Sequence, residues 1–289
     1  SYFFSTTTVL VSLWRMETFF SVNYATWYYG GRLFGLLFAI IWLRYLVFAF
    51  GFYWSLFKWW RQPLSRRHLS AKPIPVSQLR REIRWSTLTS LFFVASGTGM
   101  VIAWQQGYTQ LYVDIHAYPW WMMILSLGLA LFLHETYYYW LHRWMHRPKV
   151  YRQVHKVHHD SIQTSAMTAF SFHPYEAALQ AIAVPIIVFL VPMQVYVLLC
   201  WLVLMTVSGT LNHAGVELYP KWLLQSKMGP YLIGATHHDL HHKQFRYNFG
   251  LYFTFWDRWM GTESPKYAVE IAAKTGAQLA GQARKSANS

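Results

Sequence analysis

Fourteen of the 289 residues are histidine, and most of them fall in two short stretches, 134–159 and 237–242. Within these stretches one H-x3-H and two H-x2-HH boxes stand out: His142 and His146; His155, His158 and His159; His238, His241 and His242. Residues three and four apart share one face of a helix, so we expect each box to direct its imidazoles to one point. Neutral imidazole is the commonest protein metal ligand. Because eight imidazoles are too many for a single ion, the spacing predicts a pair of metal ions.

The predicted ligands are all nitrogen atoms. The chain has one cysteine and no H-E-x-x-H motif, which argues against a structural zinc finger and a zinc protease. Imidazole binds iron, zinc and copper, so the ligand type alone leaves the metal open. A histidine outside the boxes is more often a core or surface residue, and we expect His68 and His116 to be surface residues.

The composition is that of a membrane protein, with 54% hydrophobic, 19% aromatic and only 12% charged residues. Stretches 33–57, 86–104 and 120–141 are each close to the roughly 20 residues that cross a bilayer. The shorter runs 177–190 and 193–211, on either side of Val191-Pro192, predict a helical hairpin. The expected fold class is an all-α integral membrane bundle of about four membrane-entering helices, with a cytoplasmic histidine-rich catalytic cap.

The charge pattern predicts the orientation of this bundle. Loop 58–85 carries eight Lys and Arg residues and loop 105–119 carries none, which places the first loop in the cytoplasm and the second outside. The stretch 120–141 then delivers the boxes to the cytoplasmic side. The net charge of +14 beside apolar spans favours an anionic lipid surface or an acidic electron carrier as partner, not nucleic acid. Arg44 interrupts the first span, where a charge is costly; we expect it to snorkel or to face the bundle.

Two further residues belong to the helix of the first box. His134 lies eight residues before His142, about 12 Å along a helix, and its role as a ligand or as a partner of one is left open. Glu135 is a candidate to orient a histidine, because metal-bound imidazoles need hydrogen-bond partners. Asp239, inside the third box, is the second candidate catalytic carboxylate.

The three boxes and the residues between them resemble the fatty acid hydroxylase / sterol desaturase superfamily. The resemblance covers about residues 120–262 and rests on the order and spacing of these motifs: H-E-x-x-Y-Y-W-x-H-R-x-x-H from His134, H-K-x-H-H from His155, F-H-P-x-E from Phe172, N-H-A-G from Asn212, H-D-x-H-H from His238, N-F-G from Asn248 and W-D-x-x-x-G-T from Trp256. The family more often has Tyr where Phe249 stands. The resemblance favours His213 as a further ligand and makes four residues candidate partners of ligands: His173, His237, Asp257 and Asn212.

The resemblance implies a multi-pass membrane enzyme with two Fe ions and O2 as co-substrate. It would hydroxylate a C–H bond of a hydrophobic lipid, an acyl lipid, a sterol or hopanoid, or a carotenoid; desaturation is the alternative. Because the sequence shows no haem or flavin motif, we expect a separate electron donor, a ferredoxin or a cytochrome b5-like protein. A non-catalytic metal transporter is a further alternative, but its ligands would lie near the membrane midplane on broken helices. Zinc-dependent hydrolysis lacks a glutamate base in any box.

The expected organisation has three parts. Residues 1–32 form an N-terminal interfacial segment, 33–264 the membrane di-iron oxygenase domain, and 265–289 a flexible C-terminal tail with part of it in a weak amphipathic helix.

Overall fold

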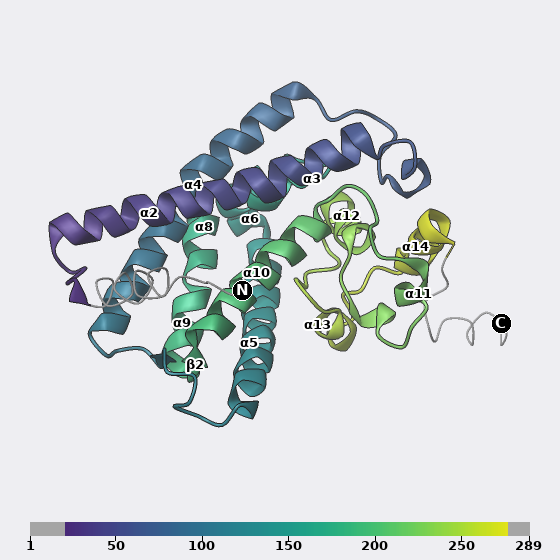
Figure 1. Ribbon diagram of the computed structural model, residues 1–289. Coiled ribbons are helices and arrows are strands. Elements are labelled where there is room, and N and C mark those ends of the chain that lie inside the picture. Colours follow the sequence, from purple (N-terminus) through teal and green to yellow (C-terminus); the bar gives the residue numbers. More distant parts are fainter. Residues whose placement is uncertain (1–20, 277–289) are drawn as a thin grey trace, which may run out of the picture.

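The computed structural model describes residues 21–276, and these residues are mostly helical (Figure 1). The longer helices are α2 (Trp27–Tyr45), α4 (Val76–Gln105), α5 (Trp121–Met145) and α10 (Val195–Asn212). Two shorter helices, α8 (Pro174–Ala181) and α9 (Ala183–Leu190), form the other arm of the expected hairpin. The remaining helices of the histidine-rich part are α6 (Pro148–Val154), α7 (Lys156–His159), α11 (Lys221–Leu224), α12 (Ala235–Gln244), α13 (Phe255–Trp259) and α14 (Tyr267–Thr275). The all-α expectation is confirmed.

Within residues 21–276, three helices are long and apolar enough to cross a membrane: Trp27–Trp59, Val76–Gln105 and Val195–Asn212. The expected stretch 120–141 is helical as α5, but α5 is not among the three, because its second half carries histidines, a glutamate and an arginine. The helical arm Pro174–Leu190 is shorter than a full span. The number of membrane crossings and the cytoplasmic side therefore stay predictions.

The first spanning helix is longer than the apolar stretch suggested. It continues from α2 through η1 (Leu46–Phe50), α3 (Gly51–Trp54) and η2 (Ser55–Trp59), where η1 and η2 are π-helical turns. Arg44 faces the bundle: its Nη1 donates to Thr206 Oγ1 on α10 at 3.0 Å. Its guanidinium carbon lies 5.7 Å from the centre of the Phe170 ring. Of the two alternatives for Arg44, the structure thus shows the inward one.

A short parallel pairing fixes one end of the bundle. In β1 (Leu111–Tyr112) and β2 (Met193–Gln194), Leu111 is paired with Met193 and Tyr112 with Gln194. The loop between α4 and α5 is thereby held to the turn of the hairpin. Figure 1 shows β2 at the lower end of α9, away from α12 and α14. The hairpin turn and the loop 105–119 consequently share the end of the bundle opposite the histidine-rich part.

Apolar packing holds the helices together in two main places. Ala130 of α5, Val188 of α9 and Trp201 of α10 lie in the core of the bundle. In the histidine-rich part, Tyr267 and Ile271 of α14 pack on Leu224 and Leu240. Because Tyr267 and Ile271 are four residues apart, they lie on one face of α14, which is an ordered helix within the segment expected to be a flexible tail. The expectations for residues 1–20 and 277–289 lie outside the described residues.

Candidate metal centre

Nine histidines gather in two adjoining groups where α5, α7, α10 and α12 meet. In each group the candidate ligand atoms all lie within 4.8 Å of one another. The five-histidine group consists of His142, His146, His155, His159 and His241; the four-histidine group consists of His158, His213, His238 and His242. All are buried except the half-buried His146. The structure thus brings together all eight box histidines and adds His213.

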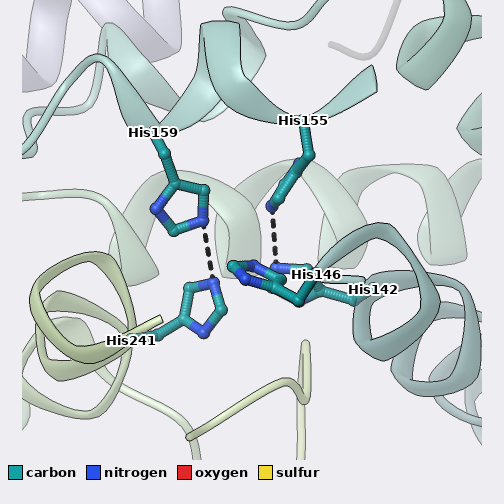
Figure 2. A group of neighbouring side chains, drawn as sticks. All are labelled: His142, His146, His155, His159 and His241. Atoms are coloured by element: carbon teal, nitrogen blue, oxygen red, sulfur yellow. Dashed lines mark hydrogen bonds between the residues drawn. The ribbon is translucent and has the colours of Figure 1, made fainter. Parts of the chain in front are cut away.

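Helical geometry explains how the boxes are divided between the groups. Figure 2 shows His155 and His159 directed from one side onto His142, His146 and His241. Neighbouring residues are about 100° apart around a helix, so His158 and His159 point to different groups, and His241 and His242 do the same. The expectation that each box serves one point is therefore wrong for both H-x2-HH boxes: each contributes to both groups.

Hydrogen bonds fix the orientation of the rings. The Nδ1 atoms of His142, His213 and His241 lie 2.7–2.9 Å from the carbonyl oxygens of Phe249, Gly209 and Tyr247, in that order. A carbonyl oxygen only accepts, so each Nδ1 donates, and in the neutral ring Nε2 then carries the lone pair. Partners of this kind orient metal-bound imidazoles and raise their basicity.

Several Nε2 atoms face one another without a proton to share. His142 and His155 have Nε2 atoms 3.1 Å apart, joined by a dashed line in Figure 2. Nδ1 of His142 donates to Phe249 and Nδ1 of His155 lies 2.8 Å from the Glu176 carboxylate, so two lone pairs meet in a buried site. His158 and His213 repeat this arrangement at 3.1 Å. Ligands at right angles around a metal at about 2.1 Å lie about 3 Å apart, so the two groups fit metal ions.

The protonation state of the clustered histidines also suits metal binding. Burial, and then the neighbouring imidazoles, lower the pKa of His155, His159 and His242 well below the usual 6.5. Burial likewise lowers the pKa of His158, His238 and His241. These rings are therefore neutral at pH 7, as metal coordination requires. Nε2 of His146 and both ring nitrogens of His242 have no hydrogen-bond partner among the described residues.

Glu135 and Asp257 hold one backbone segment beside the site. The Asp257 carboxylate accepts hydrogen bonds from the amides of Phe249 and Gly250, each at 2.9 Å. The Glu135 carboxylate accepts from the next three amides, of residues 251–253, at 2.6–3.2 Å. We name residues 249–253 the amide segment. Two buried carboxylates thus bind five successive N–H groups, and the carbonyl of the first residue orients His142. Glu135 acts on the site through this backbone and contacts no histidine of the two groups in these hydrogen bonds.

The predicted residue His134 lies outside both groups. Its Nδ1 is 2.8 Å from the hydroxyl of Tyr252, and its ring packs edge-on against Trp201. Asn212 donates from its side chain to the carbonyl of Leu251 at 2.7 Å, so it anchors the amide segment next to His213.

Three other predicted residues also lie apart from the two groups. Asp239 forms an ion pair with Lys243, one turn along α12. His173 caps α8 by accepting from the amide of Tyr175. His237 is buried, with its ring 4.9 Å from that of Tyr267.

The sequence reasoning missed Glu176 as a site residue. Its carboxylate, completely buried, is 2.8 Å from Nδ1 of His155. Glu176 ends the F-H-P-x-E motif, and a carboxylate in an apolar helix could have drawn attention to it, because buried carboxylates are rare unless paired.

The region that contains the histidine boxes matches a known protein family. The fatty acid hydroxylase family model matches residues 127–262. The chain is 30% identical to lathosterol oxidase of Homo sapiens over 184 residues, 63% of this chain and 60% of that protein. It is 34% identical to lathosterol oxidase of Mus musculus over 185 residues, with the same coverage. It is 32% identical to Delta(7)-sterol 5(6)-desaturase ERG3B of Gibberella zeae over 157 residues, 54% of this chain and 47% of that protein.

These alignments cover about half to three fifths of the length of the curated relatives. No solved structure matches the chain significantly. The matched region contains all nine histidines of the two groups, Glu135, Glu176 and the amide segment. The motifs, the family model and the relatives together support the fatty acid hydroxylase / sterol desaturase superfamily as the family of this chain.

Proposed function

We propose that the protein is an integral-membrane oxidoreductase that holds two iron ions in the nine-histidine centre and uses O2 to oxidise a C–H bond of a hydrophobic lipid. The observation that carries the proposal is the pair of buried groups in which neutral imidazoles present unprotonated Nε2 atoms to one another. Iron bound there supplies the one-electron and O2 chemistry.

The chain's own contribution is to hold and orient the ligands. One ion would be held by the five-histidine group and the other by the four-histidine group. Glu176 positions His155, and the backbone carbonyls of Phe249 and Tyr247 position His142 and His241. Because these partners are themselves fixed by the fold, the rings need little reorganisation when a metal binds.

Aromatic side chains exclude water from the centre. The ring of Phe249 lies 5.6 Å from that of His142 and 5.3 Å from that of His146, and the ring of Phe172 lies 5.1 Å from that of His158. A water-excluded site protects reactive intermediates from side reactions, which suits the oxidation of an unactivated C–H bond.

We propose a membrane lipid as substrate, since the candidate spans would anchor the chain in a bilayer with the histidine centre at one end of the bundle. The relatives are named for sterols, lathosterol oxidase and Delta(7)-sterol 5(6)-desaturase, which favours a sterol-like polycycle over an acyl chain or a carotenoid. The same names make desaturation a strong second candidate beside the hydroxylation expected from the breadth of the superfamily. In the proposed topology the histidine centre faces the cytoplasm, where a ferredoxin or a cytochrome b5-like protein would supply electrons.

The test is single-turnover oxidation under 18O2 with the iron-loaded protein, a chemical reductant and membrane sterol. An 18O-labelled alcohol supports hydroxylation, while a product two hydrogens lighter, with the label in water, supports desaturation. Two irons per chain are expected in either case. Product formation without O2 would contradict the proposal, and metal transport without oxidation would favour the transporter.

A further inference from the structure

One aromatic ring connects the five-histidine group with the protein surface. Phe245, directly after α12, is 37% exposed, yet its ring centre lies 4.8 Å from that of His159 and 6.4 Å from that of His146. Tyr151 of α6 lies 5.9 Å from Phe245 and 5.6 Å from His146. A molecule that touches Phe245 from outside is therefore one ring away from a candidate metal ligand.

The backbone at Phe245 is unusual for an aromatic residue. Its φ of 65° lies in the left-handed region, at the C-terminal end of α12. Glycine or asparagine normally occupies such a position, and a bulky residue there is an outlier that strains the backbone. Strained residues of this kind cluster at functional sites, and at Phe245 the strain accompanies a ring laid over His159.

Exposed positive charge lies close to the two rings along the chain. Arg147, Lys149 and Arg152 lie within four residues of Tyr151, and Arg246 follows Phe245; all four are exposed. None of the four forms an ion pair within residues 21–276. The nearby lysines differ, because Lys156 is paired with Asp160 and Lys243 with Asp239. The two segments that carry the aromatic pair therefore bear exposed positive charge that no ion pair compensates.

We propose that this surface, formed by Phe245, Tyr151, Arg147, Lys149, Arg152 and Arg246, is the electron-entry face, which docks a one-electron carrier protein with an acidic surface. The inference rests on the proposed function. In each encounter the reduced carrier would lose one electron, which an iron ion held by the five-histidine group would gain; two encounters would supply two electrons. Electron carriers bind their partners transiently and through small interfaces. Complementary charge steers their association, and salt weakens it.

An anionic lipid surface is the other partner that positive charge attracts. The observations favour the carrier, because charge alone explains lipid binding but not an exposed ring packed on a ligand ring. Electron transfer slows steeply with distance, and Phe245 is the exposed aromatic side chain whose ring lies nearest to the five-histidine group among the described residues, 4.8 Å from His159.

The experiment measures reduction of the iron-loaded full chain in nanodiscs of neutral lipid, by anaerobic stopped-flow spectroscopy. A reduced, acidic [2Fe–2S] ferredoxin serves as the probe, and dithionite, which needs no docking, serves as the reference reductant. The test variant reverses three charges: Arg147→Glu, Lys149→Glu and Arg152→Glu. The matched control reverses three exposed charges of another loop: Arg61→Glu, Arg66→Glu and Lys72→Glu.

We expect the test variant to be reduced by ferredoxin at least about 10-fold more slowly at low salt, with a weaker salt dependence and an unchanged rate with dithionite. The control should keep the rate of the unmodified protein. A second variant, Phe245→Gly, relieves the backbone and removes the ring; its ferredoxin rate should fall while its iron content stays the same.

Each other outcome contradicts the inference in a recognisable way. Equal ferredoxin rates in the test variant, or an equal loss in the control, would overturn it while leaving the proposed function intact. If the test variant keeps its ferredoxin rate but its purified form loses binding to phosphatidylserine vesicles, the face binds lipid instead. If dithionite also fails to reduce the bound iron, the redox centre of the proposed function fails, and this inference with it.

Discussion

The carboxylate of Glu176 lies 2.8 Å from Nδ1 of His155, and both side chains are shielded from solvent. Glu176 comes from α8 and His155 from the junction of α6 and α7, so the contact ties the hairpin to the second histidine box. A carboxylate this close to Nδ1 favours the proton on that nitrogen, which leaves the lone pair of His155 on Nε2, 3.1 Å from Nε2 of His142. Such a partner strengthens a ligand electrostatically and also limits its rotation.

We expect Glu176→Gln to lower metal affinity by roughly 10–100-fold, because the amide loses the negative charge that supports His155. Competition with a chelator, followed by elemental analysis, measures the change. Glu270→Gln on the half-exposed side of α14 is the matched control and should bind metal as the unmodified protein does. Unchanged affinity in Glu176→Gln would show that the carboxylate is only a packing element.

The division into two groups predicts selective loss of metal. His146→Ala with His241→Ala removes two ligands of the five-histidine group, and His158→Ala with His242→Ala removes two of the other group. Each double variant should retain one ion per chain where the unmodified protein holds two, and the quadruple variant should retain none. Elemental analysis of purified protein measures this. A double variant at His68 and His116, which lie outside both groups, should keep both ions.

The amide segment predicts a structural role for Glu135. Glu135→Ala leaves three buried amides without an acceptor, and hydrogen bonds to charged groups contribute about 1.5–3 kcal/mol each. We expect a loss of stability of at least about 3 kcal/mol, seen as a lower unfolding temperature in detergent. Glu135→Gln, which keeps one acceptor oxygen, should be destabilised less and retain its metal. If instead Glu135→Gln is fully stable but inactive, Glu135 takes part in the chemistry directly.

The orientation in the membrane predicts opposite labelling of two loops. Single cysteines at the exposed positions Ser65 and Gln106, in a Cys200→Ser background, should react with an impermeant maleimide from opposite sides of sealed vesicles. The contrast in positive charge between the loops 58–85 and 105–119 is the physical reason. Labelling of both from one side would show that the proposed topology is wrong.

From the sequence alone, the clustered histidines could be predicted more completely than the residues that orient them. Helical spacing is local, so His142 and His146, one turn apart, could be placed together from the chain alone. The assignment of His158 and His159 to different groups depends on which helices lie on either side of α7, and this is tertiary information. His134 shares the helix of the first box, but at about 12 Å along the axis it reaches Tyr252 instead.

The same distinction applies to the fold. The apolar stretches predicted most of the helices. The observed boundaries differ where polar residues continue a helix: α4 begins at Val76, inside the basic loop 58–85. The pairing of Leu111 with Met193 joins two-residue strands that are about eighty residues apart. No local sequence pattern predicts such a contact. Glu176 and Glu135 are partners of groups far away in the chain, so their roles also required the assembled structure.

The amide segment helps to position the ligands through its main chain, so this part of the geometry of the centre does not depend on which side chains the segment carries. Glu135 and Asp257 bind main-chain N–H groups, and His142 is oriented by a main-chain carbonyl. Any residue except proline offers the same N–H group, so a substitution at 249, 251 or 252 can keep the backbone hydrogen bonds that hold the ligand, although it changes the packing of a buried side chain. Phe249 in place of the more common tyrosine is one such change. The packing beside the centre could thus vary among related chains while the ligands keep their places.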